Sequence, residues 1–144
     1  MSIAMKTVMS FVLLFGLIAM GQDAPQVVTS PVGEPAFTVP AHSAKQYKFI
    51  VPSGASSVRL EGHFAATGGP RNSIEVWVMN DDQFVNWTNR HPVQAMYNSQ
   101  KVTQGTVKLS LPSEGNTYHV VFSNEFSVLT PKAVEASLTL KYAR

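Results

Sequence analysis

The chain has 144 residues, of which 14% are charged, and its net charge at pH 7 is +2. Such a small charge excludes the strongly basic field that nucleic acid would attract, and it offers no general attraction to an anionic membrane. The sequence contains no cysteine, which excludes disulfides, thiolate zinc sites and a cysteine nucleophile. Stability must therefore come from packing alone.

The N-terminal segment has the three parts of a secretory signal peptide. Lys6 precedes an apolar run over residues 8–20, and small residues flank the end of that run. The run is shorter than the roughly 18 residues that a membrane-spanning helix needs, so no permanent transmembrane anchor is expected. We predict a leader that begins at Met1 or Met5, is cleaved after Gly21, and directs the protein to a periplasm or out of the cell.

Prolines recur at short intervals after the leader, which predicts an extended lead-in over residues 22–35 and an edge strand near residues 36–39. Farther along, apolar residues alternate with polar ones, the period of half-buried strands. The residues expected to face inward are Tyr47, Phe49 and Val51; Val58, Leu60, Gly62 and Phe64; Ile74, Val76 and Val78; Val107, Leu109 and Leu111; Tyr118, Val120 and Phe122; and Val134, Ala136, Leu138, Leu140 and Tyr142.

Turn sequences rich in glycine, proline and serine separate these segments, and no segment after the leader has a sustained helical period. Short alternating strands of this kind predict an all-β fold, a single antiparallel β-sandwich of jelly-roll or similar type with about 7–9 strands. The predicted organisation is a signal peptide over 1–21, the lead-in over 22–35 and the sandwich domain over 36–144.

One strand near the C-terminus ends in Phe-Ser-Asn, a bulky residue and a serine, and a lysine then precedes the last alternating strand. Phe122, Asn124, Ser127 and Lys132 stand at these positions. This pattern resembles the closing hairpin of the GOLD (Golgi dynamics) domain, and the earlier strands follow the order of that domain over most of residues 36–143. The resemblance is to stand-alone secreted bacterial forms in particular, and it implies a sandwich that binds proteins or other ligands.

The cargo receptors of that family add a disulfide, a coiled coil, a membrane span and a cytosolic tail, none of which is found in this sequence, so a cargo-receptor role is not expected. The stretch FIVPSG, residues 49–54, is also similar to bacterial pre-peptidase C-terminal domains. Those domains usually carry Asp-x-Asp-Leu-Tyr where this chain has NSIEVWV.

The stretch VMNDDQFVNWTNRH, residues 78–91, follows a predicted strand, and its most direct interpretation is a loop to the next strand. Aromatic rings beside amides also suit a sugar-binding surface, because the ring covers an apolar face and the amides bind hydroxyls. The alternative is that these rings cover one open end of the sandwich. The candidate ligand-binding residues are Trp77, Phe84, Trp87, Asn89 and Tyr97.

Metal binding is a weaker possibility in the same stretch. Asn80, Asp81 and Asp82 offer oxygen ligands for calcium, but the glycine and closing glutamate of a calcium loop are missing, which favours a solvated turn. His63 and His119 are both predicted to face outward and could share a metal with Glu61 if their strands were neighbours. Solvated histidines are the alternative.

The leading functional hypothesis is a non-catalytic secreted or periplasmic binding module for an extracellular or envelope protein or a glycan, with no cofactor and no nucleic-acid partner. One alternative is a small metal-dependent hydrolase that uses Asp81, Asp82 and His91. No Gly-x-Ser-x-Gly or His-Glu-x-x-His motif supports catalysis. Another alternative is a structural envelope subunit that self-associates through its edge strands.

Overall fold

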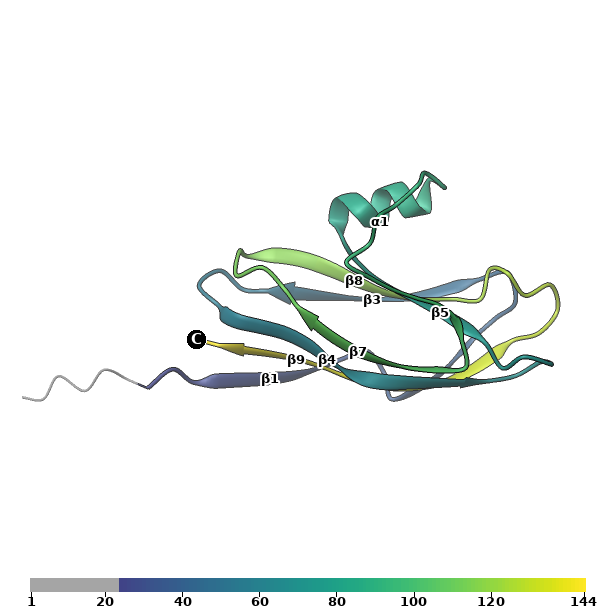
Figure 1. Cartoon of the computed structure of the whole chain (residues 1–144), viewed down its shortest axis with the longest axis horizontal. Coiled ribbons are helices and arrows are strands. Elements are labelled where there is room, and N and C mark those ends of the chain that lie inside the picture. The colour runs from purple at the N-terminus through teal and green to yellow at the C-terminus, as the bar shows by residue number, and fades with distance from the viewer. Residues whose placement is uncertain (1–23) are drawn as a thin grey trace, which may run out of the picture.

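The computed structural model describes residues 24–144, in which two antiparallel sheets pack face to face (Figure 1). The predicted leader lies outside the described residues. The first sheet, called the β4 sheet, has the order β1 (Val27–Val32), β9 (Lys132–Ala143), β4 (Ser56–Thr67) and β7 (Gln104–Ser110), and β2 (Ala36–Val39) also pairs with β9. The second, called the β8 sheet, has the order β3 (Ala44–Val51), β8 (Asn116–Ser123), β5 (Ile74–Asn80) and β6 (Tyr97–Val102). The predicted antiparallel β-sandwich is confirmed.

The core lies between the sheets and follows the predicted alternation. Val76 and Val78 of β5 and Val120 of β8 are fully buried in it, and Leu60 and Val107 reach it from the opposite sheet. β-branched and aromatic side chains predominate because they pack well on a pleated surface that is covered on one side. No helix of the described part of the chain is long and apolar enough to cross a membrane.

The first two strands share one edge of β9. β1 pairs with its C-terminal part, where Val32 lies opposite Leu138, and β2 pairs with its N-terminal part, where Val39 lies opposite Lys132. Part of the stretch predicted as a lead-in is therefore a strand of the β4 sheet. Pro31 is tolerated in β1 because β1 is an edge strand, where one side of the backbone has no ladder partner.

The expectation of a plain loop after β5 is wrong, because Asp81–Thr88 forms a helix, α1. Its start is a capping box: the Asn80 side chain accepts from the Gln83 backbone N–H, and the Gln83 side chain accepts from the Asn80 N–H. Asp81 and Asp82 in the first turn suit the positive end of the helix dipole. The helix was not expected because it is short and buries none of its own residues, so it carries no apolar period.

Candidate functional site

The structure places the predicted aromatic residues in two groups. Trp77 lies on the outer face of β5, and Phe84 and Trp87 lie on α1, which covers the outer face of the β8 sheet (Figure 1). Tyr97 pairs with the inward-facing Val78, packs against the core and donates a hydrogen bond from its hydroxyl to the Thr106 carbonyl at 3.3 Å. Burial raises the pKa of Tyr97 accordingly. Tyr97 therefore does not join the outer aromatic surface.

Much of the outer aromatic surface holds α1 in place. The Phe84 ring stacks on the His119 ring with centroids 4.1 Å apart. His119 is only 6% exposed, and its two ring nitrogens lie 2.6 Å from an Asp81 oxygen and 2.8 Å from the Gln46 side-chain oxygen. Trp87 stacks more loosely on Phe84, at 6.2 Å. These contacts fasten the first turn of the helix to β8 and leave Phe84 little surface for a ligand.

Trp77 and Asn89 also have internal contacts. The indole N–H of Trp77 donates to a Glu75 carboxylate oxygen at 2.9 Å, and the side chain is half-buried. Asn89 is the C-cap of α1, and its backbone N–H donates to the Val85 carbonyl. The predicted residues are therefore divided between α1, which holds Phe84 and Trp87 and ends at Asn89, and the strands β5 and β6, which hold Trp77 and Tyr97.

The predicted metal ligands do not form a cluster. His63 lies exposed on β4, whereas His119 lies on β8 of the other sheet, so the proposed two-histidine site is wrong. Asp81 is engaged by His119, and Asp82 and His91 are exposed. Across residues 24–144, no group of three or more His, Asp or Glu side chains could hold a metal ion.

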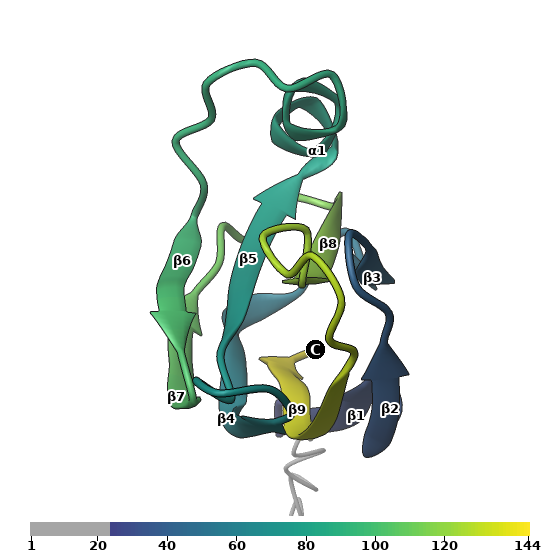
Figure 2. The same ribbon diagram turned by 90° about the vertical axis from the view of Figure 1, so that its right-hand side faces the viewer.

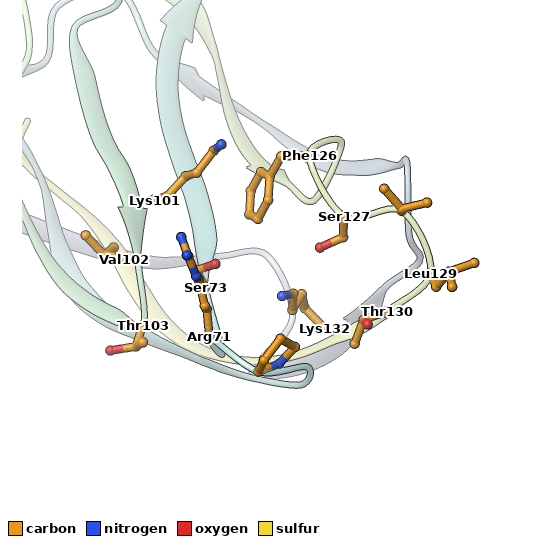
Figure 3. A pocket seen from close by; sticks show the side chains of 12 residues that line it. Arg71, Ser73, Lys101, Val102, Thr103, Phe126, Ser127, Leu129, Thr130 and Lys132 are labelled. Carbon is orange, nitrogen blue, oxygen red and sulfur yellow. The ribbon is translucent and has the colours of Figure 1, made fainter.

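A hollow lies elsewhere, at the end of the sandwich that Figure 2 turns toward the viewer, opposite the C-terminus. It is a pocket of about 650 Å³ between β6, the β4–β5 connection and the long β8–β9 connection. Its lining includes three cations, Arg71, Lys101 and Lys132, and no aspartate or glutamate. Figure 3 shows the nitrogen atoms of Arg71 and Lys132 turned toward the same space beside the Phe126 ring.

Lys132 is the unusual residue of this basic pocket, because it is only 3% exposed. As the cross-strand partner of the core residue Val39, it faces inward at the mouth of the sandwich. Its ammonium nitrogen lies 5.7 Å from the centre of the Phe126 ring, and that of Lys101 lies 4.7 Å from the same centre. None of the salt bridges among the described residues involves Arg71, Lys101 or Lys132.

Hydrogen bonds fix the β8–β9 connection, which forms one wall of the pocket. Asn124 is fully buried, and its side-chain amide N–H groups donate to the carbonyls of Val39, Pro40 and Thr130 at 2.9–3.2 Å. The Ser127 N–H donates to the Asn124 carbonyl. This anchoring sets the position of Phe126 and of the turn that follows it.

Sequence reasoning did not identify the pocket as a site. Its cations are about thirty residues apart along the chain and come from three different elements. One signal was available: Lys132 continues the inward-facing positions of the last strand, which are otherwise apolar. An ionisable residue at an inward position is uncommon unless it has a partner.

Neither the models of known protein families nor the curated proteins include a match to this sequence.

Proposed function

We propose that this protein is a non-catalytic secreted or periplasmic binding module that holds an acidic group of its ligand in the basic pocket. The observation that carries this proposal is Lys132, a residue only 3% exposed that lines the pocket and has no carboxylate within salt-bridge distance among the described residues. Buried charges in proteins are normally paired, because removal from water costs several kcal/mol per ion. A bound anion would supply the missing partner.

The surroundings of Lys132 support the same ligand chemistry. Lys101 and Arg71 add two positive charges, and the hydroxyls of Ser73 and Thr130 at the lining can donate further hydrogen bonds. Phe126 gives one wall an apolar character. A ligand that carries a phosphate or carboxylate beside an apolar group fits this combination better than a neutral sugar does.

The relation to the GOLD domain also stands as a proposal. The four residues of the resemblance meet at one junction: Phe122 packs in the core, Asn124 anchors the β8–β9 connection, Ser127 bonds to it, and Lys132 opens β9 inside the pocket. These four residues lie where the chain passes from one sheet to the other. Two proteins with a common fold would be expected to share residues at such a junction. It does not identify the ligand.

The binding proposal is tested with inorganic phosphate and phenyl phosphate, followed by NMR amide shifts of the protein. We expect saturable shifts confined to the basic pocket and tighter binding of phenyl phosphate, since its ring can contact Phe126. Lys132→Met should abolish both, whereas Lys108→Met, which removes an exposed lysine of β7, should leave them unchanged. Equal binding by the two variants would refute the proposal.

A further inference from the structure

Two large apolar side chains stand exposed at the rim of the basic pocket. Val128 is 68% exposed and Leu129 is 87% exposed, and both line the pocket as neighbours in the β8–β9 connection. Figure 3 shows Leu129 at the outer edge, directed away from the cations. Apolar side chains scattered singly on a surface need no explanation, but adjacent exposed apolar residues beside a charged site are typical of binding surfaces.

The loop displays this pair in a fixed position. The Asn124 amide donates to the Thr130 carbonyl at 2.9 Å, and the His42 N–H donates to the Ser127 carbonyl at 3.0 Å. These bonds fix both sides of Val128 and Leu129. We name these two residues the apolar tip.

The apolar tip and the cations share one end of the molecule, and the described chain ends lie at the other. Gln26 and Arg144 exchange backbone hydrogen bonds there, and Figure 1 shows the C-terminus opposite the β8–β9 connection. Neither end of the described chain would obstruct a flat surface that approaches the pocket.

We propose that the acidic ligand is an anionic phospholipid in a membrane surface, an inference that rests on the proposed function. The phosphate of one head group enters between Lys132, Lys101 and Arg71, and the apolar tip inserts into the boundary between head groups and acyl chains. Basic residues near an anionic leaflet and apolar residues that enter its interface are the two contributions that hold peripheral proteins on membranes.

The small net charge of the chain is consistent with this arrangement. With a net charge of +2, the protein has no general field to attract it to a membrane, so binding depends on the local placement of the three cations. Three acids lie on the elements around the pocket: Glu125 is exposed in the β8–β9 connection, Glu135 is exposed on β9, and Glu75 of β5 is the cross-strand neighbour of Lys101. None of the three is within salt-bridge distance of the pocket cations.

A membrane fits better than an acidic peptide. Acidic side chains of a peptide would satisfy the cations but would not cover Leu129, which lies exposed at the outer edge of the pocket lining. A lipid surface receives the head-group contacts and the apolar tip at the same time, because its charge and its apolar interior lie in successive layers.

The test is co-flotation of the protein with vesicles of phosphatidylcholine alone or with about one third phosphatidylglycerol. We expect binding only to the anionic vesicles. Lys101→Met should weaken it about five-fold, and Leu129→Ser about ten-fold. The matched controls are Lys108→Met and Ile50→Ser, which remove an exposed cation and an exposed apolar side chain far from the pocket, and they should bind as the unaltered protein does.

The contrary outcomes are distinct. Binding of phenyl phosphate without vesicle binding would overturn the membrane inference and leave the proposed function intact. Tighter binding to a phosphorylated peptide than to anionic vesicles would overturn it in favour of a protein partner. Equal loss in Ile50→Ser and Leu129→Ser would show non-specific adsorption and overturn it as well. Loss of every anion-dependent signal would overturn the proposed function together with the inference.

Discussion

Gly62, in the middle of β4, is the position where the sandwich tolerates a side chain least. Its φ is +152°, and a Cβ atom added there would lie 1.8 Å from the Ser137 carbonyl oxygen of β9. Real Cβ contacts stay beyond about 3 Å, so Gly62→Ala must push two paired backbones roughly 1 Å apart. Backbone strain of about 1–3 kcal/mol and overpacking of similar size give an expected loss of about 3–5 kcal/mol in the free energy of unfolding.

The assay is urea unfolding followed by circular dichroism, with Gly54→Ala as the control. Gly54 also has a positive φ, +84°, but an added Cβ would meet nothing within 4 Å, so only the left-handed backbone cost of about 1–2 kcal/mol applies. The difference between the free energies of unfolding of the two variants measures the cost of the close approach of β4 to β9. If Gly62→Ala were no more than about 1 kcal/mol less stable than Gly54→Ala, the close approach of β4 to β9 at Gly62 would be wrong.

Three further substitutions test local contacts. His119→Ala should speed amide exchange in α1 at least about ten-fold while the strands keep their protection, because it removes the ring that Phe84 stacks on. His63→Ala should not, and equal effects of the two variants would show that the contact between Phe84 and His119 does not hold α1. Asn124→Ala should lower the free energy of unfolding by about 2–3 kcal/mol in the same urea assay, since it leaves three carbonyls without their donor; a loss below about 1 kcal/mol would count against that network. Burial raises the pKa of Tyr118, so the unfolded chain loses its phenol proton first, and stability present below about pH 10 falls as pH rises toward the folded pKa. Tyr118→Phe should lose less stability than the unaltered protein between pH 8 and 11, and an identical loss in urea unfolding would contradict this account.

The fold could be predicted because most of its strands alternate between a buried core face and a more exposed outer face, although Met79 and Val121 are also buried on the outer face of β5 and β8. Val76, Val78 and Val120 mark the core side of β5 and β8, and the polar residues between them are the signal of period two. β6 escaped prediction because it is an edge strand with the polar sequence YNSQKV and an irregular register against β5. Its pairing is decided by the neighbouring strand rather than by its own side chains.

α1 shows where a local signal outweighs periodicity. Asn80 and Gln83 are three residues apart, the spacing of a capping box, and the aspartates that follow Asn80 suit the first turn of a helix. The helix depends on this cap and on the contact between Phe84 and His119, a residue thirty-five positions later in the chain. The same residues also predict a loop, because asparagine and aspartate are common both in turns and at the start of helices.

The basic pocket could be predicted in part, and the limit is physical. The alternation of the last strand places Lys132 on the inward face beside Val134, which identifies a lysine that is almost entirely covered by its neighbours. The alternation does not predict which residues lie beside Lys132. A lysine at this position could equally have lain beside a glutamate and formed a structural ion pair. The neighbours of Lys132 in the pocket are Lys101, Arg71 and Phe126. The chain brings them to the same end of the sandwich because it crosses between the two sheets. Those neighbours are cationic or aromatic rather than acidic, and this is the arrangement on which the proposed binding of an anion, and the proposed membrane source of that anion, depend.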